Sequence, residues 1–316
     1  MKKIEDIKTI LIIGCGTLGL RIGLRCALDG FRVKMYDISE KSVKIALATQ
    51  EKLLKSMVKK GQITEGVALE AQNRISTTTD KNVAVENVDL VSESVTEDPA
   101  LKLKVYAEFA QLFENETIIT TNTSYLLPST FAQASGAPER FCAWHFHDVF
   151  TMNVVDIMPH PQTDPSVSDL LMALSRKIHQ IPVFIQQENN GYIFNQMLLA
   201  LLGSAGDLVA RGIATPEDVD RSWIGNTKMA IGPFGMMDSI GLDTAWHVVS
   251  ARRDSRSVRF AEILKKLVDE GKLGIKTGSG FYTYPNPTFM EKASRNKILK
   301  SLKHCFERLQ KFQTNG

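Results

Sequence analysis

The stretch "TILIIGCGTLG" at residues 9–19 limits the choice of fold more than any other part of the chain. Residues 9–13 are apolar and largely β-branched, which predicts a short strand buried on both faces, as in a parallel sheet. Three glycines follow in GxGxxG spacing, and the next residues have the pattern of a helix that ends at Gly30. "FRVKMYD" then predicts a second strand that ends in Asp37. This order of strand, tight turn, helix and strand is typical of a dinucleotide-binding α/β sheet.

Each glycine of the motif has a separate physical role. Gly14 allows the tight turn, Gly16 leaves backbone N–H groups open to a pyrophosphate, and Gly19 lets the helix pack close to the strand. The helix N-terminus, which includes Thr17 and Leu18, stabilises the phosphate charge. We therefore expect these five residues to bind the cofactor.

Asp37 decides which cofactor is expected. A carboxylate at the end of the second strand accepts hydrogen bonds from the adenosine ribose and repels a 2′-phosphate, so NAD is favoured over NADP. A GxGxxG motif alone is weak evidence, because a tight turn can exist without a nucleotide. Here the strand, the helix and the terminal Asp37 support the same interpretation.

The alternation of strands and helices continues with "VDLVSESV", "KLKVYAEFAQLF" and "TIITTNTS". Ligands of such sheets bind at the carboxyl ends of the strands. Four polar residues lie at or just after these ends: Glu93, Glu97, Asn122 and Ser124. We predict a Rossmann-type, doubly wound parallel sheet domain over residues 1–187, with its ligand site at this edge.

An insertion at about residues 40–76 has a helical pattern that is broken near Gly61. It predicts a helical hairpin that could reach over a long substrate. Lys55, Lys59 and Lys60 either bind phosphates there or simply form a solvated helix face, and both interpretations stay open.

The second half of the chain, residues 188–316, shows helical periodicity and no strand alternation. Thr215 is the expected N-cap of one helix, with Pro216 in its first turn. We predict a smaller all-α domain after a boundary near Gln187. The tail from about Asn286 has the pattern of an amphipathic helix that packs on its own domain or on a partner subunit.

Composition excludes several classes of function. The formal net charge of +3 over 316 residues is too small to indicate a nucleic-acid partner. The four cysteines have no metal-binding spacing, and no apolar run is long enough to span a membrane. We expect a cytoplasmic protein without a metal site.

The segment "HFHDVF" is the best candidate for chemistry. His145 begins it, and Asp156 follows eleven positions later in "NVVDIM". "FCAWHF" and "NVVDIM" look like two strands joined by a turn, which would bring the two side chains together. His145 is then either a base held by a carboxylate or a structural histidine at the end of a strand.

Seven segments in the same order resemble the 3-hydroxyacyl-CoA dehydrogenases, a family that includes relatives acting on small hydroxy acids such as carnitine and gulonate. The resemblance covers nearly all of residues 7–285. The matching segments are "ILIIGCGTLG", "SESVTEDPALK", "TNTSYL", "HFHDVF", "NGYIFNQML", "GPFGMMDSIGLDT" and "GKLGIKTGSGFYTY".

The resemblance implies a chemistry for these residues. A histidine takes the proton of a 3-hydroxyl while the carbon gives a hydride to NAD, and a carboxylate fixes the histidine. By position these are His145 and Asp156. Ser124 would bind the substrate oxygen or the nicotinamide ribose, and Asn195, expected in the first helix of the second domain, would hold the substrate oxygen.

The resemblance also implies cofactor contacts and an assembly. Glu97 and Lys102 match residues near the nicotinamide half, and Lys276 matches a residue that returns to the cofactor. Asn122 and Asp148 complete the expected cofactor contacts. The family forms dimers through the helical domain, so a homodimer is expected.

The departures from the family pattern cluster in "HFHDVF". The family usually has His-x-x-Asn-Pro and a glutamate twelve positions after the histidine, whereas here Asp148 and Val149 follow and Asp156 is one position closer. We place the deletion in the turn, so that the dyad survives. Asp148 could compete as the partner of His145, and His147 could be a second polar group near the site.

Three functions remain open on this basis. The leading one is NAD-dependent oxidation of a 3-hydroxyacyl-CoA, or the reverse reaction. The second is oxidation of a small free hydroxy acid, which the altered loop would suit. The third is an NAD-binding protein with impaired chemistry, which the retention of His145, Ser124 and Asn195 disfavours.

Overall fold

The computed structural model describes residues 2–250 and 255–290 and divides the chain into two compact units. The first unit comprises Met1–Gln196 and the second Met197–Gly316. The boundary predicted near Gln187 lies before this division, in the segment that follows the last strand. The predicted fold class is confirmed, because the first unit holds a mostly parallel sheet and the second is helical.

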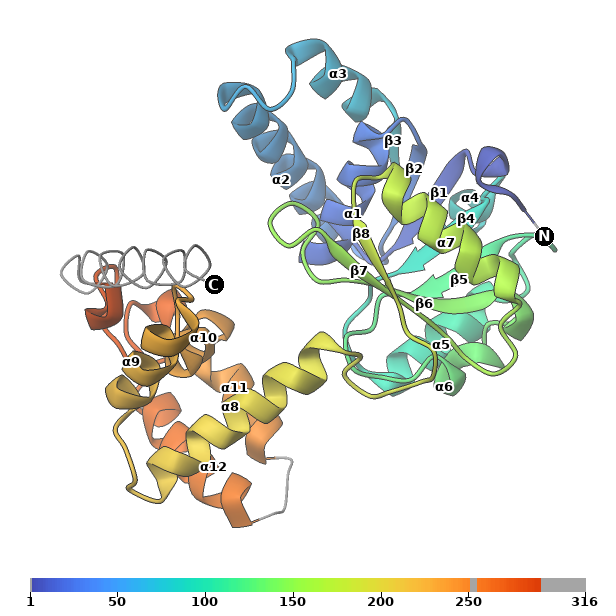
Figure 1. Cartoon of the computed structure of the whole chain (residues 1–316). Helices are drawn as coiled ribbons and strands as arrows, with labels where there is room; N and C mark the ends of the chain where they lie inside the picture. Colours follow the sequence, from blue (N-terminus) through green and yellow to red (C-terminus); the bar gives the residue numbers. More distant parts are fainter. Residues whose placement is uncertain (1, 251–254, 291–316) are drawn as a thin grey trace, which may run out of the picture. The chain divides into compact units, whose positions relative to one another are not determined.

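An eight-stranded sheet forms the centre of the first unit, in the order β3-β2-β1-β4-β5-β6-β7-β8 (Figure 1). All neighbouring strands are parallel except β6 and β7, which are antiparallel. The order from β3 to β6 is that of a dinucleotide-binding sheet, whose ligand crevice lies where the strand order reverses, beside β1 and β4. The strands are β1 Thr9–Ile13, β2 Arg32–Tyr36, β3 Ile75–Thr78, β4 Leu90–Glu93, β5 Ile118–Thr121, β6 Phe141–Phe146, β7 Val154–Pro159 and β8 Ile181–Phe184.

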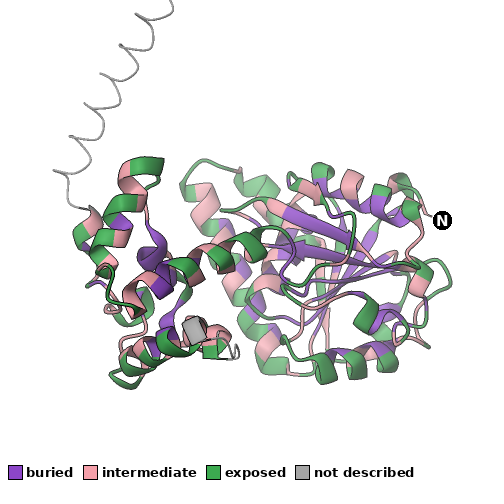
Figure 2. Ribbon diagram, turned by 60° about the horizontal axis from the view of Figure 1, so that its bottom comes forward, coloured by how far each residue is buried: buried purple, intermediate pink, exposed green. Residues whose placement is uncertain are grey.

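Helices cover both faces of this sheet, and the central strands are almost completely buried (Figure 2). Alternate residues of β6 show why: Cys142, Trp144 and Phe146 belong to one core cluster, with α1 and α7, whereas Phe141 packs on the opposite face with α5 and α6. His145 therefore lies on the face of Phe141. These helices are α1 Thr17–Leu28, α4 Lys81–Val85, α5 Pro99–Phe109, α6 Ser129–Ala132 and α7 Pro165–Lys177.

The insertion after β2 forms two helices that extend beyond the sheet beside β3 (Figure 1). α2 spans Glu40–Lys59 and α3 spans Glu65–Asn73, with Ser39 and Thr64 as N-caps. Gly61 between them has φ +67°, a value that glycine adopts without strain. The structure thus has a helix on each side of Gly61, as the helical pattern and its break predict.

The second unit is built around the helices α8 Phe194–Ala210, whose first three residues belong to the first unit, α9 Pro216–Thr227, α10 Pro233–Ile240, α11 Leu242–Ser250 and α12 Ser255–Asp269. Its core gathers apolar residues from these helices, including Leu202, Phe234 and Leu264. Thr215 caps α9 by accepting the N–H of Asp218, as the sequence predicts. The amphipathic helix expected at the end of the chain lies outside the described residues for most of its length.

None of the helices in the described residues is both long and apolar enough to cross a membrane.

Candidate active site

The turn between β1 and α1 has the geometry that a dinucleotide requires. Gly14 has φ +100°, and a Cβ on Gly19 would lie 2.1 Å from the carbonyl oxygen of Gly14. A Cβ on Gly16 would meet no protein atom within 4 Å. Gly14 and Gly19 are therefore required by the protein itself, whereas the exposed Gly16 leaves room for a ligand at the helix N-terminus. Thr17 is also exposed there, and Leu18 packs on the core.

Asp37 is held at the carboxyl end of β2. One carboxylate oxygen accepts the N–H of Cys15 at 3.0 Å, and the other accepts the N–H of Ser39 at 2.9 Å. The carboxylate is half-buried beside the glycine turn. These residues fit an adenosine ribose bound at this position, as the sequence predicts for NAD.

Glu93 at the end of β4 is the centre of a buried polar network. Its carboxylate accepts hydrogen bonds from Lys102 Nζ at 2.7 Å, from Tyr106 Oη at 2.9 Å and from Thr121 Oγ1 at 2.9 Å. Both Glu93 and Lys102 are buried. Lys102, expected to contact the cofactor, thus has its ammonium group within the protein interior, where it also lies 3.4 Å from Glu97.

Glu97 organises the loop after β5. Its Oε1 accepts the N–H of Ser124 at 2.9 Å and that of Tyr125 at 3.2 Å, and the hydroxyl of Thr123 also donates to it. Asn195, in the first turn of α8, donates from Nδ2 to the carbonyl oxygen of Ser124 at 3.0 Å. The structure therefore brings Glu97, Ser124 and Asn195 together, and the division into compact units places Asn195 with the first unit.

His145 and Asp156 lie directly opposite each other on the antiparallel strands β6 and β7. Their side chains project from the same face of the sheet, and His145 Nδ1 is 3.0 Å from Asp156 Oδ2. A carboxylate only accepts hydrogen bonds, so Nδ1 is the donor and Nε2 is the nitrogen left to accept a proton. The shortened loop between the strands has therefore not moved Asp156 to the wrong face of the sheet.

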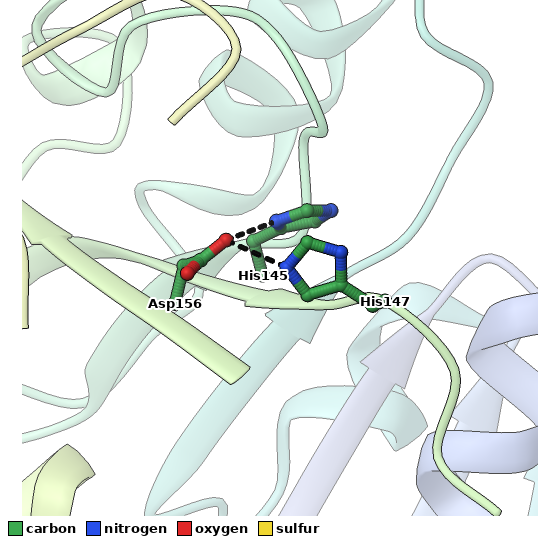
Figure 3. A group of neighbouring side chains, drawn as sticks. All are labelled: His145, His147 and Asp156. Carbon is green, nitrogen blue, oxygen red and sulfur yellow. Dashed lines mark hydrogen bonds and ion pairs between the residues drawn. The ribbon is translucent and has the colours of Figure 1, made fainter. Parts of the chain in front are cut away.

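His147 binds the same carboxylate oxygen from the next position on that face. Its Nε2 is 2.9 Å from Asp156 Oδ2, so one oxygen accepts from two imidazoles (Figure 3). His147 is the first residue after β6, and its N–H still donates to the carbonyl oxygen of Val154 on β7 at 3.4 Å, which keeps its ring within reach of the same acceptor. Asp148, the other candidate partner of His145, points elsewhere and pairs with Arg21 at 3.0 Å.

Burial and charge have opposing effects on the His145–Asp156 pair. Burial lowers the pKa of His145 below its ordinary value of 6.5, the hydrogen bond to Asp156 raises it, and the neighbouring His147 lowers it again. The net direction is downward, which keeps the imidazole neutral. Burial raises the pKa of Asp156, but the hydrogen bonds from both histidines outweigh it and hold the pKa below 3.8. The pair thus combines a neutral base with an ionised carboxylate.

Aromatic rings enclose the two histidines. The ring of Tyr192 lies 4.7 Å from that of His145, and the ring of Phe194 meets that of His147 edge-on at 5.4 Å. These contacts limit the rotation of both imidazoles. Ring contact and hydrogen bonding together fix the direction of His145 Nε2.

Comparison with known proteins assigns this arrangement to a family. The model of the 3-hydroxyacyl-CoA dehydrogenase NAD-binding domain matches residues 9–188, and the model of the C-terminal domain of the same enzymes matches residues 191–284. The chain belongs to the 3-hydroxyacyl-CoA dehydrogenase family. It is accordingly an NAD-dependent oxidoreductase, as the sequence predicts.

Individual relatives are similar to the chain over almost their whole length. The mitochondrial hydroxyacyl-coenzyme A dehydrogenase of Sus scrofa is 30% identical, covering 88% of this chain and 91% of its own. The 5-formyl-3-hydroxy-2-methylpyridine 4-carboxylate 5-dehydrogenase of Mesorhizobium japonicum (strain LMG 29417 / CECT 9101 / MAFF 303099) is 32% identical, covering 95% and 99%. The solved structure of a diketoreductase is 34% identical with a TM-score of 0.84, covering 90% and 100%.

The remaining residues expected at the site make other contacts. Asn122 accepts the N–H of Phe146 at 2.8 Å and so ties β5 to β6. Asp148 accepts the N–H groups of Phe150 and Thr151 besides its pair with Arg21. Lys276 belongs to the second unit, where its ammonium lies 2.6 Å from Asp243.

Two neighbours of the site were missed by reasoning from the sequence. Arg21 pairs with Asp148 across 127 positions, and only the fold brings them together. Tyr192, whose ring lies 4.7 Å from that of His145 at a tilt of 39°, has φ +56° and follows Gly191 at φ +76°. The Asn-Gly pair before Tyr192 signals such a turn, but it gives no hint of the ring that Tyr192 meets.

Proposed function

We propose that this chain interconverts 3-hydroxyacyl-CoA and 3-oxoacyl-CoA thioesters with NAD, using His145 as the general acid–base and Asp156 to orient it. The observation that carries the proposal is the 3.0 Å contact between His145 Nδ1 and Asp156 Oδ2 on opposed strands of a family fold that binds NAD.

The dyad is suited to proton transfer at one atom. Asp156 fixes the tautomer that has its proton on Nδ1, so His145 Nε2 accepts the proton of the substrate hydroxyl. The positive charge that then forms on the ring is stabilised by the adjacent carboxylate. NAD⁺, when bound at the glycine turn, supplies the hydride acceptor. In the reverse direction the same nitrogen returns the proton to the developing alkoxide.

Ser124 and Asn195 would position the substrate. Glu97 holds the backbone of Ser124, and Asn195 is anchored to the same residue through its carbonyl oxygen. A hydroxyl and a carboxamide fixed in this way can hold the substrate oxygen at the reacting geometry without reorganising. Lys102 supports this arrangement from inside, because it neutralises Glu93 and approaches Glu97.

The helices α2 and α3 support a CoA substrate rather than a small one. Lys59 and Lys60 are exposed at the end of α2, where they can bind phosphate groups, and Lys55 is exposed but already paired with Glu51 at 2.6 Å. The C-terminal end of a helix repels phosphate, so the lysines must supply the attraction.

A small free 3-hydroxy acid, such as carnitine or gulonate, is the second candidate. It is favoured by the altered segment after His145, where His147 and Asp148 stand at the dyad. The similarity to a diketoreductase, an enzyme of dicarbonyl compounds, also supports a substrate without CoA. The homodimer expected for the family would form through the helical unit.

Activity with acetoacetyl-CoA and NADH separates these candidates. The CoA proposal expects turnover, measured as loss of NADH absorbance, and expects free acetoacetate to react much more slowly. The small-acid candidate expects no turnover of the thioester and NADH production from one member of a panel of free hydroxy acids.

A further inference from the structure

Two histidines and a carboxylate converge at one point on the sheet. His145 lies on β6, His147 is the first residue after the end of that strand, and Asp156 faces His145 from the neighbouring strand β7. One ligand atom from each residue lies within 4.8 Å of the others, and His145 Nδ1 and His147 Nε2 are the nitrogens that contact Asp156 Oδ2. The backbone N–H of His147 still donates to the carbonyl oxygen of Val154 at 3.4 Å, and the rings of both histidines reach the same Asp156 oxygen (Figure 3).

This donor set is one that divalent transition metals prefer. Zinc binds imidazole nitrogen and carboxylate oxygen at about 2.0–2.2 Å in tetrahedral geometry, which puts ligand atoms roughly 3.3 Å apart. The two contacts to Asp156 Oδ2 measure 3.0 and 2.9 Å, so a small rotation of the Asp156 side chain would admit an ion. Two histidines and one carboxylate leave a fourth position open, as in catalytic zinc sites.

The surroundings of the three side chains favour metal binding, because the side chains are shielded from water and held in place. The side chains of His145 and Asp156 are almost completely buried, and that of His147 is 9% exposed. Tyr192 and Phe194 pack against the two rings and restrict their rotation. A shell of this kind lowers the entropy that the ligands lose on binding a metal, and the partly exposed His147 gives a path of entry.

We propose that His145, His147 and Asp156 form a binding site for a divalent transition metal of the zinc type, and that metal binding switches off the dehydrogenase. The sequence alone gave no reason to expect a metal, since the cysteines lack metal spacing and "HFH" needs the opposed carboxylate to form a site. Metal binding is independent of the proposed function, whereas the inhibition rests on the proposed function.

The inhibition follows from the tautomer of His145. A metal on Nδ1 displaces the proton that this nitrogen donates to Asp156, and a neutral imidazole then has its remaining proton on Nε2. Nε2 is the atom that accepts the proton of the substrate hydroxyl. With the metal bound, the base is therefore blocked at its reacting nitrogen, and removal of the metal restores it without any covalent change.

Zinc affinity is measured on the full chain by competition with a chromophoric chelator, after dialysis against EDTA. We expect one Zn²⁺ per chain in the wild type and a loss of affinity of at least about 10²-fold in His147→Asn and in Asp156→Asn, since each variant removes a ligand. The matched control is His179→Asn, which removes another histidine that lies near a carboxylate, 3.4 Å from Asp29. His179 has φ +57°, a conformation that asparagine tolerates.

NADH fluorescence and the thermal midpoint of each variant show whether it is folded. The proposal is overturned if the wild type binds less than one equivalent of zinc, or if folded His147→Asn binds zinc as the wild type does. Inhibition is read separately, as loss of acetoacetyl-CoA turnover on adding Zn²⁺ and recovery with EDTA. Zinc bound at the expected residues in a protein that has no dehydrogenase activity, with or without EDTA, would refute the proposed function and leave the binding site standing.

Discussion

At the scale of single residues, the site depends on one carboxylate oxygen. Asp156 Oδ2 accepts from His145 and His147 at nearly equal distances, so the orientation of both rings depends on it. The spacing in the sequence was sufficient to pair His145 with Asp156, because hairpin register follows from the alternation of the two strands. The spacing was not sufficient to predict the contact between His147 and Asp156, because a histidine at the end of a strand can equally turn to solvent.

Replacing Asp156 with asparagine should cost about 10²-fold or more in kcat, because an amide can donate to Nδ1 and stabilise the wrong tautomer of His145. The measurement is steady-state turnover of acetoacetyl-CoA. Asp169→Asn, which removes the same charge from an exposed position on α7, is the control and should react like the wild type. Equal rates for both variants would show that Asp156 does not orient the base.

Substitutions of two glycines in the turn after β1 should affect different properties: one the stability of the protein, the other its affinity for NADH. Gly19→Ala places a Cβ against the carbonyl of Gly14 and should lower the free energy of unfolding by about 1–3 kcal/mol. Gly16→Ala meets open space in the protein, so it should unfold like the wild type yet bind NADH more weakly. Thermal unfolding and NADH fluorescence measure the two effects. NADH binding unchanged in Gly16→Ala would argue against a pyrophosphate at this turn.

At the scale of elements, the long and strongly patterned segments were predictable and the short edge strands were not. β1 has five buried residues, four of them apolar, and α2 runs for 20 residues, so their patterns are unambiguous. β3 and β8 have four residues each and are partly exposed, and β8 contains Pro182. They exist because a neighbouring strand offers hydrogen bonds, which local sequence does not show.

Asp89 fastens the first strand to the rest of the sheet and should make stability depend on pH. It accepts the N–H groups of Lys8 at 2.8 Å and Thr9 at 2.9 Å, and Lys2 pairs with it. Burial raises its pKa, but these hydrogen bonds outweigh burial and hold the pKa below 3.8. A carboxylate whose pKa is lowered by folding stabilises the fold at pH values above its unfolded-state pKa. This stabilisation is lost as pH falls through the pKa of the folded state.

Asp89→Asn should therefore be less stable than the wild type by about 1–2 kcal/mol at neutral pH, and the difference should shrink as pH falls from about 5 to about 2. Urea unfolding across this range is the measurement, with Asp169→Asn as the control for removing a carboxylate. If the difference in free energy of unfolding stayed constant down to about pH 2, the charge of Asp89 would not contribute to stability.

At the scale of the whole molecule, the chain combines a nucleotide-binding unit with a helical one, and this division was predictable from the change in periodicity. The helical unit has a groove lined by α11 and α12, including Trp246, Val258 and Ala261. Val258 is 46% exposed. A homodimer formed through the helical unit would cover this apolar surface.

Val258→Asp should therefore shift the protein toward monomer, because it places a charge in an interface that excludes water. Light scattering over a dilution series is the measurement. Val67→Asp, at an exposed apolar position on α3, is the control and should leave the mass unchanged. A wild type that is monomeric at all concentrations would exclude the dimer.

The central claim is that His145 is the acid–base of an NAD-dependent 3-hydroxyacyl-CoA dehydrogenase. Its most direct test follows NADH absorbance with acetoacetyl-CoA in the wild type and in His145→Ala, with NADH binding measured on both. We expect turnover by the wild type and a fall of about 10²-fold or more in the variant, with NADH still bound. Equal turnover by the two proteins, or no turnover by a wild type that binds NADH, would contradict it.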